Sequence, residues 1–387
     1  MGYRCARAAQ DPMTPYFQEL HEAIQANGGF FNAHLHLDRA GTFHPTLELL
    51  QAQGVMDGAS LSLPGKHAVI PGIHASDCYD PIQLYNRVER YVFDMISVGT
   101  TRADTVVDTT TDRVGLTALE TFARLKERHA GAIDIRYGAY SPLGFRDDQP
   151  QRWALLEEGA AMADFVGLLP ERDDKADYPD HIGFEESCRR ALSLAHRLGK
   201  QIHIHADQAF HRYEGCSELI VRIVRDMGLG LQPEEEPFIW LIHFISPSTY
   251  DEARFFSLVD EMASLNIGVI SCPGAAISMR QYRPFPSPTY NCIARVLDLV
   301  ANGVHVRIGS DNVCDITSPM GTVNLMDELL VLGNAMRYYD IHFLSSIAAG
   351  KKLDSVGVTR LKNHLAENAA FVQSIVRRHA AELSVVG

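Results

Sequence analysis

Short apolar runs alternate with amphipathic stretches along most of this 387-residue chain. Within the amphipathic stretches, apolar residues recur at positions i, i+3, i+4 and i+7, which is the spacing of a helix with one buried face. These stretches predict helices at 116–129, 184–198, 216–227, 249–265 and 291–302. The apolar runs predict strands at 29–35, 101–107, 133–140, 165–169, 201–205, 238–244, 267–271 and 304–308.

Strands that alternate with helices in this way form a parallel sheet. Eight strand–helix units of roughly thirty residues are typical of a (β/α)8 TIM-type barrel, and we predict that α/β fold here. A doubly wound sheet is the alternative, but no GxGxxG motif follows the first strand. We expect a single domain over residues 1–387, with the barrel at about 29–345 and C-terminal helices at about 354–386.

A long insertion at 38–80 interrupts this repeat between the first two strands. It contains Gly58, Pro64-Gly65 and Pro71-Gly72, so we predict that it is rich in loops. Insertions of this length in a compact domain are usually functional, and this one would lie over the mouth of the barrel. Further helices are expected at 13–27 and 326–335.

The composition excludes several classes of function. A net charge of −13 argues against a surface for nucleic acid or for an anionic membrane. Seven scattered cysteines without a CxxC pair indicate reduced thiols. The first residues lack an apolar signal region, and no apolar run is long enough to span a membrane. We therefore expect a cytoplasmic protein that binds a small molecule and that can self-associate.

Histidine and aspartate residues stand where several predicted strands end. His34 and His36 close the first strand, and in a strand the side chains of i and i+2 share a face. His205, His243 and Asp311 follow the fifth, sixth and eighth strands. Because active sites of such barrels lie at the carboxyl ends of the strands, these five side chains should converge. Nitrogen and oxygen donors of this kind suit a divalent metal such as zinc, iron or manganese.

Motifs around these residues resemble those of the amidohydrolase superfamily and, within it, of the bacterial cytosine deaminases. The similar segments are 32–38, 102–108, 164–170, 311–315 and 319–326. The resemblance implies one metal ion bound by His34, His36, His205 and Asp311. It also implies that His243 hydrogen-bonds the attacking water or the substrate. The fourth strand has no lysine, which argues against the binuclear subtype with a carboxylated lysine.

The chain departs from the cytosine deaminases in its expected substrate pocket. Their pattern places an acid three residues after the strand-5 histidine, where this chain has Gln208. An amide cannot give up and recover a proton as a carboxylic acid can. Asn312 replaces a second acid, and the glutamine expected after the third strand is absent. Cytosine is therefore a poor candidate substrate, and the small β-sandwich typical of the family is expected to be reduced or missing.

The resulting hypothesis is a metal-dependent hydrolase, deaminase-like, that cleaves C–N bonds of a small, nitrogen-containing and cyclic substrate. Asp311 would move the proton, assisted by His243 and Gln208. The expected substrate contacts are Asp38, Asp207, Gln208, Arg280 and Asn312. A cyclic amide, lactam or imide hydrolase is one alternative, and a non-hydrolytic ligand-binding homologue or a metal-dependent lyase is another.

Overall fold

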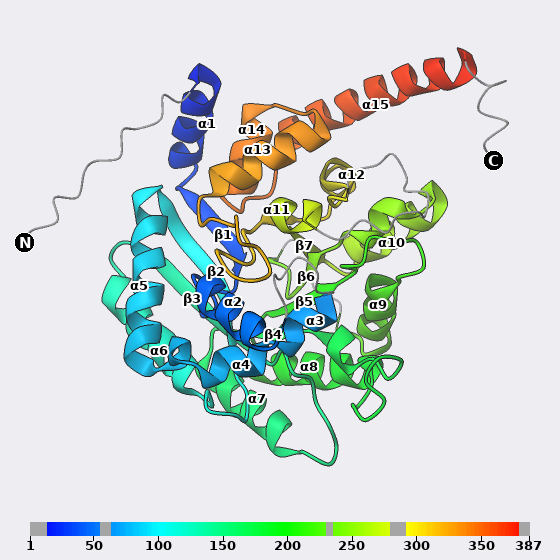
Figure 1. Ribbon diagram of the computed structural model, residues 1–387. Coiled ribbons are helices and arrows are strands. Elements are labelled where there is room, and N and C mark those ends of the chain that lie inside the picture. The colour runs from blue at the N-terminus through cyan, green and yellow to red at the C-terminus, as the bar shows by residue number, and fades with distance from the viewer. Residues whose placement is uncertain (1–13, 55–62, 230–234, 279–291, 379–387) are drawn as a thin grey trace, which may run out of the picture.

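Eight parallel strands form a barrel in the computed structural model, which describes residues 14–54, 63–229, 235–278 and 292–378 (Figure 1). The strands neighbour one another in chain order, and a parallel bridge between Leu35 and Asp311 joins the last strand to the first. The strands are β1 (Phe30–Leu35), β2 (Thr100–Asp108), β3 (Asp134–Tyr140), β4 (Phe165–Leu168), β5 (Ile202–Ala206), β6 (Ile239–His243), β7 (Ile267–Ser271) and β8 (Val306–Ile308). The predicted (β/α)8 barrel is confirmed.

The strands are buried almost throughout, as strands of a parallel sheet must be when helices cover its outer face. The helices that follow strands are α6 (Thr117–His129), α7 (Gln151–Met162), α8 (Phe184–Leu198), α9 (Cys216–Asp226), α10 (Glu252–Ser264), α11 (Pro273–Ile277) and α12 (Val296–Ala301). All strands of the described ranges belong to this one sheet, so those ranges contain no β-sandwich.

Some helix boundaries differ from the prediction for local reasons. The predicted helix at 249–265 is a 3-10 turn, η3 (Ser246–Thr249), followed by α10, because the Asp251 side chain caps a new helix by accepting from the Arg254 amide. The prediction missed α7, in which only Leu156, Gly159 and Ala160 are buried. So narrow a buried stripe leaves little periodicity in the sequence.

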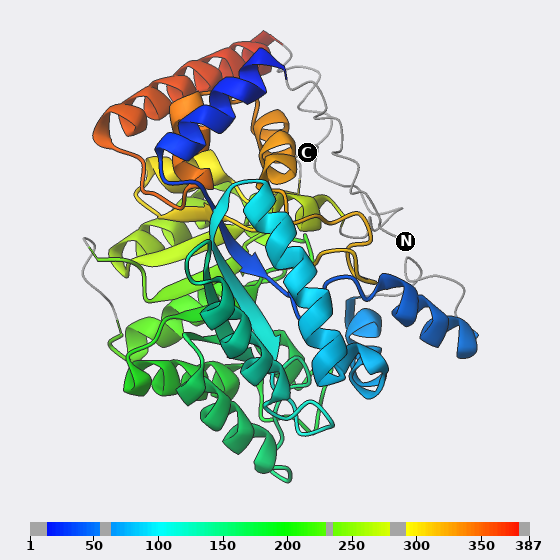
Figure 2. The same cartoon turned by 90° about the vertical axis from the view of Figure 1, so that its left-hand side faces the viewer.

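The insertion is more helical than we predicted. It forms α2 (Phe43–Ala52), α3 (Leu63–Ala68), α4 (Ile70–Ala75) and the 3-10 turn η1 (Asp77–Tyr79), while Gly58 lies outside the described residues. Pro64 and Pro71 sit in the first turns of α3 and α4, where the missing proline N–H costs no hydrogen bond. The insertion lies at the carboxyl ends of the strands (Figures 1 and 2). Lys66 Nζ in this insertion donates to the Thr317 carbonyl at 3.2 Å.

Of the remaining helices, α5 (Pro81–Ser97) packs on β2 and α6. The others are α1 (Pro15–Ala26), α13 (Leu325–Met336), α14 (Ile341–Ala348) and α15 (Ser355–Arg378). Figure 2 shows α1 beside α14 and α15 at the same end of the molecule. No helix in the described ranges is long and apolar enough to cross a bilayer. The six cysteines placed by the structure are free.

Substitution of Gly309 by alanine is expected to destabilise the closure of the barrel. A Cβ at this position would stand 2.7 Å from both the amide nitrogen and the carbonyl oxygen of His34. Because these atoms are backbone, they cannot move without displacing β1, and we expect a loss of about 3 kcal/mol. Urea unfolding would measure this loss. Gly131→Ala is the control, since a Cβ there meets nothing within 4 Å. Equal stability of the two variants would contradict the close approach.

Candidate metal centre and active site

Four donor side chains from three parts of the barrel meet at the carboxyl ends of the strands. His34 lies in β1 and His36 directly follows it, His205 lies in β5, and Asp311 follows β8. Asp311 Oδ1 lies 3.6 Å from His34 Nε2 and 3.3 Å from His36 Nε2. The Nε2 atoms of His36 and His205 are 3.3 Å apart. All four side chains are buried, and one donor atom of each lies within 4.8 Å of the others.

Several polar atoms of this cluster lack a hydrogen-bond partner. Both ring nitrogens of His34, Nδ1 of His36 and Oδ1 of Asp311 are buried without one, as far as the described residues extend. Buried polar atoms are rarely left without a partner, because their desolvation costs free energy. A divalent cation accepts three imidazole nitrogens and a carboxylate oxygen as ligands. The four residues therefore fit a mononuclear metal site.

The charge states of the cluster also suit a cation. Burial lowers the pKa of His36 to about 4 and lowers the pKa of His205 well below its usual range, so both rings are neutral. Burial acts to raise the pKa of Asp311, but the adjacent imidazoles of His34 and His36 outweigh burial and hold that pKa well below its usual range. Neutral imidazole and ionised carboxylate are the forms that bind a metal.

A hydrogen bond behind the cluster orients His205. Its Nδ1 donates to the carbonyl oxygen of Leu168, the last residue of β4, at 3.1 Å. A carbonyl can only accept, so the proton is on Nδ1 and the lone pair of Nε2 faces the cluster. Ligating histidines are commonly held by such a second bond, which fixes the tautomer and the ring orientation.

Three residues at the ends of strands adopt left-handed backbone conformations that favour glycine. They are Asp207, His243 and Asp311, with φ of 59°, 77° and 60°. Such conformations are costly and are concentrated at functional sites. The ring of His243 lies 5.5 Å from that of His205 and 6.2 Å from that of His34, between centroids. Burial lowers the pKa of His243 to about 4, so a neutral imidazole stands beside the four donors.

Three of the expected substrate contacts form hydrogen bonds with other residues of the protein. The Asp207 carboxylate accepts from the amides of Cys216 and Ser217, at 2.8 and 3.1 Å, and so holds the start of α9. Asp38 is fully buried and accepts from the Tyr79 hydroxyl at 2.9 Å. The Asn312 side chain donates to Asp315 at 2.5 Å. Arg280 lies outside the described residues.

Gln208 is placed beside an acid that the sequence analysis did not single out. Its side-chain nitrogen donates to Glu171 Oε2 at 2.8 Å, and Glu171 lies in the 3-10 turn η2 (Pro170–Asp173) that follows β4. Tyr140, the last residue of β3, was also missed. Its ring centroid is 5.5 Å from that of His36 and 5.3 Å from that of His205. The position of each residue at the end of a predicted strand was the available signal.

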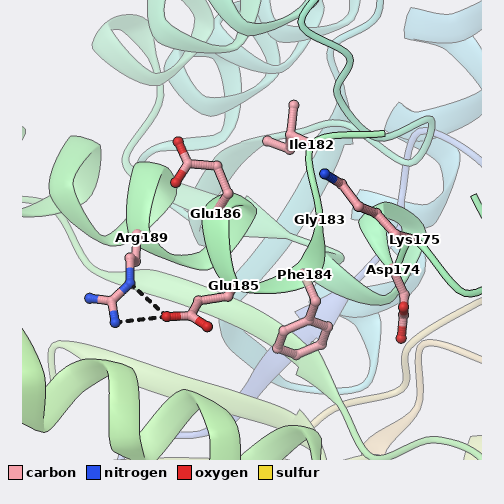
Figure 3. A pocket seen from close by; sticks show the side chains of 8 residues that line it. All are labelled: Asp174, Lys175, Ile182, Gly183, Phe184, Glu185, Glu186 and Arg189. Atoms are coloured by element: carbon pink, nitrogen blue, oxygen red, sulfur yellow. Dashed lines mark hydrogen bonds and ion pairs between the residues drawn. The ribbon is translucent and has the colours of Figure 1, made fainter. Parts of the chain in front are cut away.

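A second group of possible metal ligands and a surface pocket are alternative candidate sites, and both are less well suited to hold a metal ion than the four-residue cluster. Glu171, Glu214 and Cys216 also bring donor atoms within 4.8 Å, but burial raises the pKa of the Cys216 thiol and so disfavours the metal-binding thiolate. A surface pocket of about 420 Å³ lies where η2 meets α8 (Figure 3). Its lining is largely charged: Asp174, Lys175, Ile182, Gly183, Phe184, Glu185, Glu186 and Arg189. No member of the four-residue cluster is among these described lining residues.

A buried ionic network supports the rim next to the cluster. Arg39 Nε donates to Asp108 Oδ2 at 2.8 Å, and His74 from α4 lies between Asp108 and Asp112, at 2.9 and 2.7 Å. Burial acts against a charge on His74, but hydrogen bonds to the two aspartates raise the pKa of His74 to about 9. The network thereby ties the insertion to the end of β2.

The stability of the protein should therefore fall in alkaline solution. The pKa of His74 is about 9 in the folded chain and near 6.5 when unfolded, so protonated His74 stabilises fully below pH 6.5. This contribution, roughly 3 kcal/mol, is lost as the pH rises through 9. Urea unfolding of the wild-type protein and of His74→Gln between pH 6 and 10 would measure the decline. The difference between their free energies of unfolding isolates the contribution of His74 from that of other titrating groups. A difference that does not change with pH would contradict the assignment.

Comparisons with known proteins place the fold. No family model matches the chain. An uncharacterised protein from Haemophilus influenzae is 26% identical over 261 residues, which cover 67% of this chain and 86% of that protein.

Solved structures provide the clearer comparison. The 5-methylcytosine deaminase of Klebsiella pneumoniae, liganded with 5-fluorocytosine, has a TM-score of 0.69 and 22% identity, covering 83% of this chain and 72% of that one. For N-isopropylammelide isopropylaminohydrolase of Burkholderia multivorans, the TM-score is 0.61 at 20% identity, with 87% and 74% covered. For guanine deaminase of C. acetobutylicum with bound guanine, it is 0.51 at 12% identity, with 86% and 72% covered.

These likenesses define the class of fold. The chain shares its barrel fold with the two deaminases and with the isopropylaminohydrolase. A His-His-His-Asp cluster lies at the end of the barrel where enzymes of this architecture have their active sites.

Proposed function

We propose that this protein is a metal-dependent hydrolase that cleaves C–N bonds in a small, cyclic, nitrogen-containing substrate. The observation that carries the proposal is the cluster of His34, His36, His205 and Asp311, with buried donor atoms that no described residue satisfies. Proteins that share the fold support the substrate class, since their names refer to 5-methylcytosine, N-isopropylammelide and guanine.

The four clustered residues would hold one divalent ion. When bound, such an ion supplies a Lewis acid that activates water and polarises the bond under attack. Asp311 would act as the base, because its Oδ1 faces the cluster, lacks a hydrogen-bond partner and belongs to an ionised carboxylate. The neutral ring of His243 would hold the water or the substrate by a hydrogen bond.

The proton taken up by Asp311 must then reach the leaving nitrogen. Gln208 cannot carry it, because a carboxamide has no proton to exchange at neutral pH. Asp311 alone would therefore protonate the leaving group. This arrangement suits cleavage of a cyclic amide, lactam or imide, and it also permits loss of an amine from an activated ring.

A product screen tests this function. Protein reconstituted with zinc, iron(II) or manganese(II) would be incubated with ring amides and amino-substituted rings, and ammonia and new carboxylates would be measured. Ammonia alone indicates a deaminase, whereas a new carboxylate indicates an amide hydrolase. The same screen on His34→Ala/His36→Ala gives the background. Absence of both products from metal-loaded protein would contradict the proposal and favour a binding homologue or a lyase.

A further inference from the structure

The side chains of Gln208 and Glu171 form a pair at the rim between β4 and β5. Gln208 follows β5 by two residues, and Glu171 follows β4 by three. These strands are neighbours in the barrel. The 2.8 Å bond from Gln208 Nε2 to Glu171 Oε2 joins the two loops, and Gln208 is only 7% exposed.

Glu171 is an acceptor in this pair. A second donor, the backbone amide of Asp207, also faces its carboxyl group. Burial, together with the nearby carboxylates of Glu214 and Asp207, raises the pKa of Glu171. The neutral carboxyl group still keeps a carbonyl oxygen that accepts from an amide. In the structure, Glu171 accepts from the NH₂ end of the Gln208 amide and so holds that end toward itself.

The orientation of the Gln208 side chain leaves its carbonyl oxygen free to accept a hydrogen bond. The oxygen and nitrogen of a primary amide point in different directions, so fixing Nε2 also fixes Oε1. Throughout the described chain, Oε1 has no hydrogen-bond partner, and it is not among the polar atoms sealed from solvent. Gln208 therefore presents a pure acceptor at the rim that carries the metal cluster.

We propose that the carbonyl of Gln208 recognises a ring N–H of the substrate, and that Glu171 is the positioning residue that sets this orientation. The substrate class is then a cyclic amide or imide, which carries an N–H beside its carbonyl. A ring that turns an unprotonated nitrogen toward Gln208 would set two lone pairs against each other. The inference rests on the proposed function for the reaction. The hydrogen bond between Gln208 and the ring N–H can be tested by ligand binding alone.

Rings that present no N–H to the Gln208 carbonyl should bind much more weakly than rings that do. A site built to hydrogen-bond one group leaves its own polar atom unpaired when that group is missing. Sites of this kind discriminate much more sharply than apolar pockets that differ by a methylene group. We therefore expect at least a tenfold difference in Kd between a ring N–H compound and its N-methyl counterpart.

Ligand-observed NMR on the zinc-loaded full-length protein tests this inference, because one set of spectra reports binding and turnover together. The probes are succinimide, glutarimide, hydantoin and dihydrouracil, with their N-methyl counterparts. Wild-type protein should prefer the N–H rings. In Glu171→Gln the Gln208 amide can turn over, so the preference for glutarimide over N-methylglutarimide should shrink at least tenfold while the zinc content is unchanged.

Glu214→Gln is the matched control. Glu214 lies next to Glu171, but its carboxylate accepts from the Ala209 amide at 2.8 Å and from Ser246 rather than from Gln208. The substitution Glu214→Gln therefore removes a neighbouring carboxylate and leaves the bond between Gln208 and Glu171 intact. The preference for N–H rings should stay as in wild type. An equal shift in both variants would mean that charge, and not orientation, sets the preference, which would overturn the inference.

The outcomes separate this inference from the proposed function. Hydrolysis of the N-methyl imides at least as efficient as that of the N–H imides would overturn the inference and leave a C–N hydrolase. A preference for N–H rings without turnover of any compound would support the inference and contradict the proposed function. Binding of neither ring class to zinc-loaded protein would contradict the inference.

Discussion

The variant His34→Ala/His36→Ala should contain no metal when purified without chelator, whereas the wild-type chain should contain about one divalent ion per molecule. The double substitution removes two of the four donors and leaves only His205 and Asp311. Two ligands do not form a closed site for zinc or iron. Elemental analysis by mass spectrometry measures the stoichiometry, and C–N hydrolysis should fall to background in the same preparation.

His203→Ala is the control for this experiment. His203 is a buried histidine of β5 whose ring packs on Phe165, with centroids 4.2 Å apart. It does not belong to the metal cluster, so the metal content should stay at the wild-type level. Circular dichroism would confirm that both variants fold. Metal retained by the double variant would exclude the cluster as the site. A wild-type chain that binds no ion even after reconstitution would favour a binding homologue without metal.

The barrel and its four donors could be predicted because the information is local. Each strand of a parallel barrel is buried on both faces, so it stands out as a short apolar run between helical stretches. The carboxyl end of each run then fixes the rim on which a side chain lies. His36, His205 and Asp311 are far apart in sequence, but the repeat places them on one rim, and the structure brings their donor atoms within 4.8 Å of one another.

The neighbours of the cluster could not be predicted, because they depend on contacts between loops. Asp207 follows a predicted strand in the same way as a substrate contact would, but its carboxylate caps α9. Glu171 gains its importance only from Gln208, which lies 37 positions away in the chain. The insertion contains Pro-Gly pairs that are typical of turns, but Pro64 and Pro71 begin helices. Sequence patterns indicate which elements form, and tertiary packing decides which partner each polar group finds.

Asp311→Asn should reduce turnover of the substrate by a factor of about 10³ or more, because the amide cannot accept a proton. Asparagine keeps an oxygen close to His34 and His36, so metal binding should weaken less than in the double histidine variant. The metal content of the assayed protein must therefore be measured together with kcat. Saturating zinc would restore the metal but not the activity if Asp311 is the base.

Asp315→Asn provides the comparison for this prediction. Asp315 is a buried aspartate in the same loop, and its carboxylate accepts from the amides of Thr317 and Ser318 at 2.8 and 2.9 Å. Its substitution should loosen the loop and lower stability by about 1 kcal/mol, with a much smaller effect on kcat than Asp311→Asn. Wild-type turnover in metal-loaded Asp311→Asn would exclude Asp311 as the proton carrier. The base would then be sought in the neutral imidazole of His243, which faces the same cluster.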